Sequence, residues 1–276
     1  KTRKIVSGTS HFNLHIPRSG GTALCQYIRA NHSRWTRRKG NCWISAYCPF
    51  WIPEENLCFP EVIPCNKTKL PNRFVMNERW LDHPICPNRS QYSIILRDPV
   101  SRSMSNTDLF FYFEEVNHMM GPCQLPQNDS SLEYINFDDT KRKYMLSKLS
   151  SVMTNYITWA LVSNGRPNYR PTRQDLPLAK QVLSRFDYIL DHSSDCIKTT
   201  YRVMFEKVPA VHSASYYTPE LNRSRLSKYR DTYDMSAFER LNHLDLPLYE
   251  YSKKLQEADC LFWAAIQENQ TTKNVN

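Results

Sequence analysis

The segment His11–Ala30, HFNLHIPRSGGTALCQYIRA, constrains the fold more than any other stretch of the chain. Its first part, His11–Ile16, is apolar enough for a short buried strand, and Ala23–Ala30 continues as a helix. The loop between them, Pro17–Thr22, contains two adjacent glycines, two hydroxyls and one cation. A strand, a small-residue loop and a helix in this order point free backbone N–H groups at one position. The segment therefore predicts an anion-binding loop.

Each residue type in this loop suits a phosphate-like ligand. Gly20 and Gly21 have no Cβ, so the backbone there can come close to a ligand. Ser19 and Thr22 add hydroxyl donors, and Arg18 adds a charged fork of N–H groups. The loop contains neither Gly-Lys-Ser/Thr nor G-x-G-x-x-G, so it is neither a Walker loop nor a dinucleotide-binding loop. Considered alone, it fits an ordinary glycine turn capped by Ser19 equally well.

A second junction between a strand and a helix is predicted in SIILRDPVSRSMSN. Ser93–Leu96 is an apolar run typical of a buried strand, and Pro99 suits the first turn of a new helix. Arg97 ends the strand, and Ser105 follows eight residues later on the predicted helix. Ligands of parallel sheets bind at the carboxyl ends of the strands, which is where both junctions are expected.

The two motifs resemble those of sulfotransferases that use 3′-phosphoadenosine 5′-phosphosulfate (PAPS) and release 3′-phosphoadenosine 5′-phosphate (PAP). Among these, the chain is most similar to the Golgi enzymes that sulfate glycosaminoglycans, of the heparan sulfate 2-O and 6-O type. The resemblance implies that Arg97 and Ser105 hold the 3′-phosphate of the nucleotide. It also implies a 5′-phosphosulfate loop made of Arg18, Ser19, Gly20, Gly21, Thr22 and Ala23.

The resemblance further implies a base for the acceptor hydroxyl shortly before the second strand. The matching stretch is FVMNERWLD, and the matching position is Glu78, where the heparan sulfate enzymes usually have His. A surface carboxylate paired with Arg79 is the other interpretation of Glu78, and His83 is the alternative base. Arg18 stands where the family more often has Lys, and we expect it to stabilise charge on the leaving phosphate. No metal ion is expected.

Two further side chains near these motifs have open or structural interpretations. Arg102, on the helix that carries Ser105, is expected either to assist the phosphate or to be exposed. His15 lies nearest the loop, and its place in the strand favours a structural hydrogen bond.

The order of the predicted elements indicates an α/β fold, with a central parallel sheet flanked by helices. The resemblance implies the P-loop-kinase-like sulfotransferase fold, as one domain over residues 1–268 with a cysteine-rich excursion at about 40–90. A disordered tail is expected at 269–276. The predicted strands lie within Arg73–Asp82 and at His11–Ile16, Ser93–Leu96, Tyr188–Leu190 and Val208–His212. The predicted helices include Asp139–Val162, Asp175–Phe186, Ser194–Phe205 and Ser236–Gln267, the last broken around Leu246-Pro247.

Cysteines and glycosylation sequons indicate the compartment. There are 9 cysteines, no C-x-x-C pair and no zinc-like spacing, so disulfides are the simpler interpretation. The odd number leaves one cysteine over, and Cys25 is expected to be free and buried. Six Asn-x-Ser/Thr sequons favour the secretory lumen. With the resemblance, they predict the Golgi-luminal part of a type II membrane protein whose N-terminal anchor is absent.

Charge and motifs leave several functions to compare. A net charge of +9 suits a polyanionic nucleotide and a glycan acceptor, and no nucleic-acid-binding motif is present. The main hypothesis is transfer of a sulfuryl group from PAPS to a polysaccharide or glycan hydroxyl. A tyrosylprotein sulfotransferase is the alternative in the same class, because a Glu base also fits it. A nucleotide kinase is disfavoured by the missing Gly-Lys-Ser/Thr, and a basic sulfated-glycan-binding protein is the non-enzymatic alternative.

Overall fold

The computed structural model describes residues 10–31, 74–77, 81, 85, 90–107, 154–164, 166, 169–191, 193–205 and 234–273. Its strands are β1 (Ser10–His15), β2 (Phe74–Asn77), β3 (Ser90–Leu96) and β4 (Tyr188–Asp191). The helices before β4 are α1 (Gly21–Asn31), an unlabelled helix at 99–107, α4 (Tyr156–Val162), η2 (Arg173–Asp175) and α5 (Leu176–Leu183). Those after it are α6 (Ile197–Phe205), α8 (Met235–Leu241) and α9 (Asp245–Lys273).

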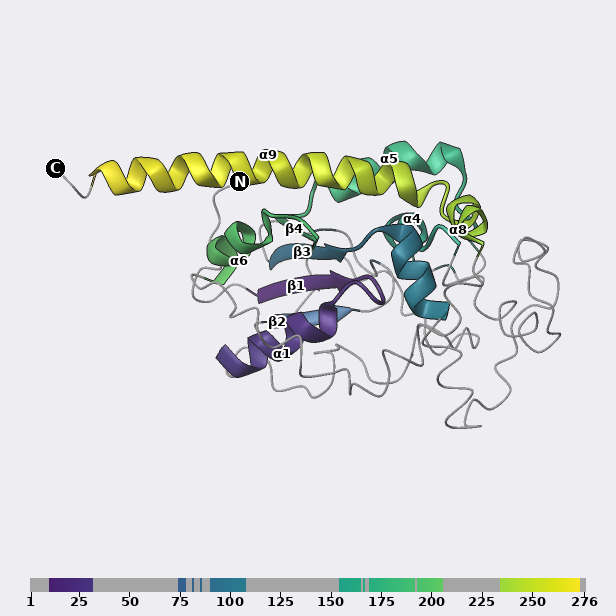
Figure 1. Ribbon diagram of the computed structural model, residues 1–276, viewed down its shortest axis with the longest axis horizontal. Helices are drawn as coiled ribbons and strands as arrows, with labels where there is room; N and C mark the ends of the chain where they lie inside the picture. Colours follow the sequence, from purple (N-terminus) through teal and green to yellow (C-terminus); the bar gives the residue numbers. More distant parts are fainter. Residues whose placement is uncertain are drawn as a thin grey trace.

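The four strands form one parallel sheet in the order β2-β1-β3-β4 (Figure 1). This confirms the α/β class and the parallel sheet. The predicted strands correspond to β1, β3 and β4, and the strand predicted within Arg73–Asp82 is β2. From β1 the chain passes to β2 on one side, while β3 pairs with β1 on the other side. The carboxyl ends of β1 and β3 are therefore a topological switch point, where open α/β sheets bind their ligands.

Helices cover both faces of the sheet because alternate strand residues point to opposite sides. Phe12 and Leu14 of β1 belong to a core that includes residues of α4, α5 and the first half of α9. Met76 of β2 and Leu190 of β4 belong to a second core with residues of α1, α6 and the later part of α9. In Figure 1, α9 runs along the top of the molecule past β4, and α1 lies below β1. Both faces of the sheet are thus shielded from water.

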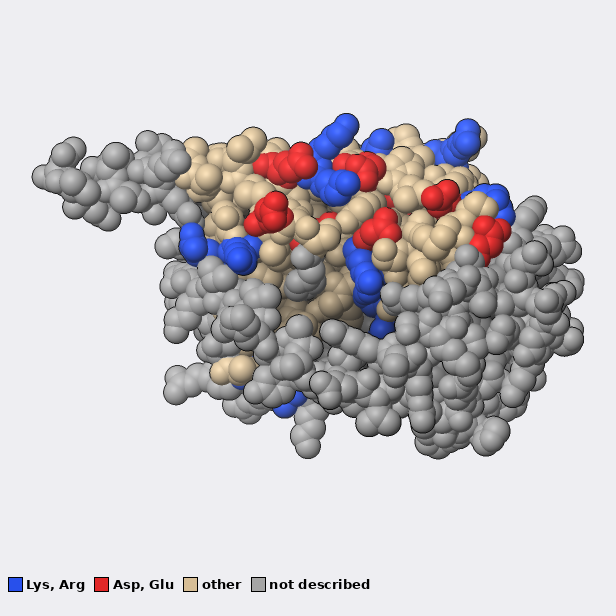
Figure 2. Space-filling view, in the orientation of Figure 1, with Lys and Arg blue, Asp and Glu red and all other residues tan. Residues whose placement is uncertain are grey.

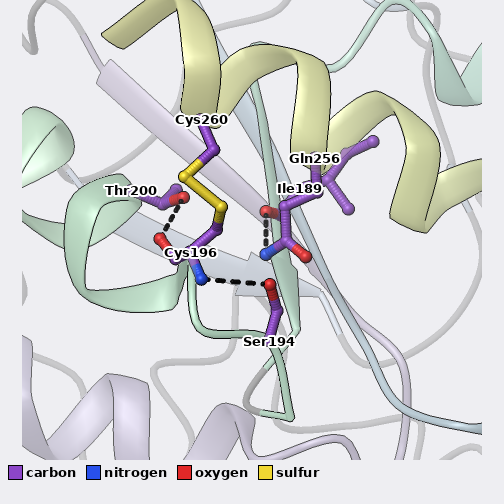
Figure 3. The surroundings of a disulfide bond; sticks show 6 residues. All are labelled: Ile189, Ser194, Cys196, Thr200, Gln256 and Cys260. Atoms are coloured by element: carbon purple, nitrogen blue, oxygen red, sulfur yellow. Dashed lines mark hydrogen bonds between the residues drawn. A yellow bond between two sulfur atoms is a disulfide. The ribbon is translucent and has the colours of Figure 1, made fainter. Parts of the chain in front are cut away.

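A disulfide holds α9 against the end of the sheet. Cys196, just before α6, is bonded to Cys260 of α9 (Figure 3). One turn earlier in α9, the Gln256 amide Nε2 donates a hydrogen bond to the Ile189 carbonyl of β4 at 3.2 Å. The expectation of disulfides is therefore confirmed at this pair. Cys25 is fully buried as predicted, but it too is disulfide-bonded, so the expectation that it is free was wrong.

Helix ends differ from the sequence-based predictions at three places. Asn155 has a left-handed backbone, with φ 47°, so α4 starts after it, and residues 139–153 of the predicted helix Asp139–Val162 lie outside the described residues. The break between α8 and α9 precedes Asp245, and Pro247 lies in the first turn of α9, where its missing N–H does little harm. Finally, α9 continues to Lys273, into the range 269–276 that was expected to be disordered. Extending an existing helix is easier than starting one.

Other predictions fall outside the described residues. They include the strand Val208–His212 and most of the cysteine-rich excursion at about 40–90. Within the described part of the chain, no helix is both long and apolar enough to cross a bilayer.

Candidate anion-binding site

The loop between β1 and α1 is a tight turn with unusual backbone angles. The Ser19 N–H donates to the Ile16 carbonyl at 3.1 Å, and Arg18 and Gly20 have positive φ values of 66° and 96°. Glycine adopts such angles without strain, whereas a residue with a side chain does so at a cost of about 1–3 kcal/mol. The left-handed backbone at Arg18 therefore stores strain at the carboxyl end of β1, which is typical of functional loops.

Backbone donors gather where this loop enters α1. The N–H groups of Gly20, Thr22 and Ala23 have no acceptor among the described residues. The Ser19 hydroxyl is buried, with its residue 3% exposed, and it also has no hydrogen-bond partner there. Unsatisfied N–H groups at a helix N-terminus carry the positive end of the helix dipole, so they favour an anion. A buried hydroxyl without a partner is the group that a ligand in this loop would satisfy.

Two of the predicted loop contacts are made inside the protein. The Ser19 N–H closes the turn, and the Gly21 N–H donates to His15 Nε2 at 3.1 Å. A Cβ added to Gly21 would clash with the His15 ring. Gly21 is therefore required by the packing of the His15 ring, a reason that adds to the predicted close approach of a ligand.

His15 is a structural acceptor, as its place in the strand predicted. Its side chain is buried, and burial together with the nearby Arg18 cation lowers its pKa to about 3. The ring is therefore neutral at physiological pH, and Nε2 is available to accept the Gly21 N–H. A neutral histidine thus anchors the first residue of α1 to the end of β1.

The junction after β3 is built differently. Asp98 Oδ1 accepts the Ser101 N–H at 2.7 Å, and the Asp98 carbonyl accepts the Arg102 N–H at 2.9 Å. Asp98 is thus the N-cap of the helix at 99–107, with Pro99 as its first residue. The alternative interpretation of Arg97 is a salt bridge with Asp98, whereas Asp followed by Pro is the pattern of an N-cap and a first helical residue.

Three predicted site residues converge between the two junctions. Arg18 Nε donates to Ser105 Oγ at 3.0 Å, across 87 residues of sequence. Arg97 Nη1 donates to the Arg18 carbonyl at 3.3 Å, across 79 residues. In the space-filling view, Lys and Arg side chains lie near the ends of β1 and β3, at the right-hand edge of a hollow (Figure 2). The residues predicted to bind the 5′-phosphate and those predicted to bind the 3′-phosphate therefore lie next to one another.

Arg102 is buried, so the expectation that it is exposed was wrong. Its side chain is fully buried, with Nη2 3.3 Å from Ser103 Oγ and 3.4 Å from Asn242 Oδ1. Its guanidinium carbon lies 5.4 Å from the centre of the Tyr156 ring. Burial lowers the pKa of Arg102, and the Asp245 carboxylate raises it. Arg102 is thus part of the helical interior.

The predicted base cannot be placed in this arrangement. Glu78 and the alternative base His83 lie outside the described residues, as does the Thr22 side chain. Among the residues that the structure describes, no group of three or more His, Cys, Asp or Glu side chains is arranged to hold a metal ion. No protein-family model matches the chain, and no curated protein matches it either. Functional interpretation therefore depends on the geometry of the site.

Proposed function

We propose that the protein is a PAPS-dependent sulfotransferase that acts on a hydroxyl of a glycan or polysaccharide, with the P-loop-kinase-like sulfotransferase fold. The observation that carries this proposal is the convergence of Arg18, Arg97 and Ser105 at the switch point of a parallel sheet. PAPS has a charged group at its 5′ end and a separate 3′-phosphate. Two adjacent anion sites, one built from backbone and one from side chains, match that pattern.

The residues of the two junctions would bind different phosphates of the nucleotide. The backbone N–H groups of Gly20, Thr22 and Ala23, with the Ser19 hydroxyl, would bind the 5′-phosphate at the N-terminus of α1. Arg97 and Ser105 would bind the 3′-phosphate, because a guanidinium and a hydroxyl both donate to phosphate oxygens. Arg18 already contacts both of these residues: its carbonyl accepts from Arg97, and its Nε donates to Ser105. It would stabilise the charge that develops on the leaving phosphate.

In the proposed reaction the acceptor oxygen forms a bond to sulfur while the bond from sulfur to the phosphate oxygen breaks. PAP leaves with the electron pair, and the acceptor proton goes to a base, for which Glu78 is the candidate. The donor already carries a good leaving group, so the protein contributes mainly alignment and electrostatic stabilisation. Arginine keeps its charge at all relevant pH values, so Arg18 would act as a fixed cation and not as an acid.

The disulfides support an oxidising compartment for this activity. Cys196–Cys260 and the bonded Cys25 fit the secretory lumen, as the sequons do, and we propose the Golgi lumen as the location. A luminal enzyme would meet glycan acceptors there.

Transfer of labelled sulfate from PAPS to a panel of glycans and tyrosine peptides tests the proposal. We expect label on glycans, and we expect Arg97→Ala to weaken PAP affinity about 10–100-fold, because it removes a hydrogen bond from a charged donor to phosphate. Arg240→Ala, an exposed substitution on α8, is the control and should bind PAP as the wild type does. Glu78→Gln should lose turnover and keep PAP affinity. Label on tyrosine peptides alone would favour the alternative acceptor, and failure to bind PAP would reject the proposal.

A further inference from the structure

Five buried polar side chains form a cluster where the helix at 99–107 meets α4, α8 and α9. None of them is more than 2% exposed. The cluster, called the polar corner below, consists of Arg102, Ser103, Asn155, Asn242 and Asp245. Polar groups in a helical interior must be arranged to satisfy one another, so they fix the positions of the helices that carry them.

One side of the polar corner ties the helix at 99–107 to α8. Arg102 Nη2 lies 3.4 Å from Asn242 Oδ1, and Asn242 Nδ2 donates to Ser103 Oγ at 3.0 Å. Asn242 Nδ2 also donates to the Phe238 carbonyl at 2.8 Å, so the amide is fixed by its own helix end. The end of α8 therefore contacts two successive residues of the helix that begins at the second junction.

The other side of the polar corner ties α4 to α9. Asp245 accepts the N–H groups of Ile157 and Thr158, both at 2.8 Å, and the Thr158 hydroxyl at 2.7 Å. In return, the Leu244 N–H donates to Asn155 Oδ1 at 2.8 Å. Asp245, the first residue of α9, thus caps the N-terminus of α4, while Asn155, just before α4, holds the residue just before α9. Burial raises the pKa of Asp245, and the Arg102 cation lowers it, which couples the two sides of the corner.

Ser105 lies one turn beyond Arg102 on the same helix, and its hydroxyl accepts the hydrogen bond from Arg18 Nε. A helix is stiff over this distance, so whatever fixes Arg102 also fixes Ser105. We propose that Arg102 is a positioning residue of the nucleotide site, which locks its helix to the polar corner and so holds Ser105 against Arg18. The part of this inference that concerns the 3′-phosphate rests on the proposed function.

Arg102→Lys is the sharpest test, because it keeps the charge and removes the planar fork that reaches Asn242 and packs on Tyr156. We would measure the dissociation constants of PAP and of adenosine 5′-phosphate, which lacks the 3′-phosphate. We expect the preference for PAP to fall about tenfold, the effect of one misplaced hydrogen bond to a charged group, while affinity for adenosine 5′-phosphate stays within about twofold. Arg240→Lys, on the exposed side of α8, should keep the preference unchanged.

A double-mutant cycle with Ser105→Ala separates positioning from general destabilisation. If Arg102 acts through Ser105, Arg102→Lys should cause no further loss of preference once Ser105 is alanine. Additive losses, or equal losses for both nucleotides, would overturn the inference. Should Arg102→Lys not fold, Asn242→Ala removes the partner on α8 and carries the same expectation.

A ligand-free measurement distinguishes failure of this inference from failure of the proposed function. In a crystal structure of Arg102→Lys, or of Asn242→Ala, we expect the hydrogen bond from Arg18 to Ser105 to be broken. An intact contact would reject the positioning role whatever the protein binds. A wild-type protein that binds neither nucleotide would reject the proposed function and leave the structural result to decide the role of Arg102.

Discussion

The two junctions that form the site are built in opposite ways. At the first, the Gly21 N–H donates to His15, but the N–H groups of Gly20, Thr22 and Ala23 have no acceptor among the described residues. The loop before α1 also has a left-handed backbone at Arg18. At the second, Asp98 caps the N-terminus of its own helix, and the Ser101 and Arg102 N–H groups there already have acceptors. The first junction is therefore suited to bind an anion with its backbone. The second is suited to do so only with side chains, Arg97 and Ser105.

This difference indicates that the first junction is built for binding an anion and the second for stability. A helix whose first N–H groups are left open is less stable than a capped one, and its loop is strained. The neighbouring capped helix supplies the rigid support, through Ser105, for Arg18 in the strained loop. Substitutions at the first junction should therefore affect activity most, and substitutions at the second should affect stability or the 3′-phosphate.

The largest effect is expected from removing the cation of the first junction. Arg18→Gln should lower the rate of sulfate transfer about 10²–10³-fold, the usual effect of losing one preorganised donor to a developing charge. Arg18→Lys keeps the charge and should lose less. The measurement is kcat with labelled PAPS under saturating conditions. Equal activity of the Gln and Lys variants would contradict the role of the cation.

A smaller effect is expected from filling the space beside His15. Gly21→Ala puts a Cβ where the imidazole lies, and overpacking of this kind should lower the free energy of unfolding by about 1–3 kcal/mol. Chemical denaturation measures this change. The matched variant His15→Ala with Gly21→Ala removes the ring and should recover part of the loss. If Gly21→Ala alone is neutral, the ring is not what requires glycine.

The first junction should also respond to acid. His15 has a pKa of about 3 in the folded protein and 6.5 as its ordinary value, so below pH 6.5 the unfolded chain binds a proton that the folded protein does not. The free energy of unfolding should therefore fall as the pH falls from 6.5 towards 3. His15→Gln should reduce this slope by about 1.4 kcal/mol per pH unit. His11, whose pKa burial also lowers to about 3, should keep its own contribution in that variant. Identical slopes would contradict the prediction.

The smallest effect is expected at the capped junction. Asp98→Ala removes the acceptor of the Ser101 N–H and should lower the free energy of unfolding by about 1 kcal/mol. Asp98→Asn keeps an acceptor and should lose less. Affinity for adenosine 5′-phosphate should not change in either variant, because that ligand would contact the first junction. A large loss of that affinity would mean that the two junctions do not act separately.

The sequence predicted those features that depend on neighbouring residues. The alternation of β1, the glycine loop, the strand before Arg97 and the helix after Pro99 follow from side-chain period and turn chemistry, which act over a few residues. For the same reason the α/β class was predictable. The convergence of Arg18, Arg97 and Ser105 required in addition that two such junctions lie side by side in one sheet, as the parallel order of the strands allows.

The tertiary structure alone decided which partners distant residues find. Cys25 is bonded and not free, Arg102 is buried in the polar corner, and Gly21 makes room for the His15 ring. None of these follows from local pattern. The sequence by itself determined where strands, loop and caps occur, because the backbone period and the first turn of a helix are short-range properties. Which side chains then meet depends on the packing of elements far apart in the chain, and only the folded arrangement fixes that.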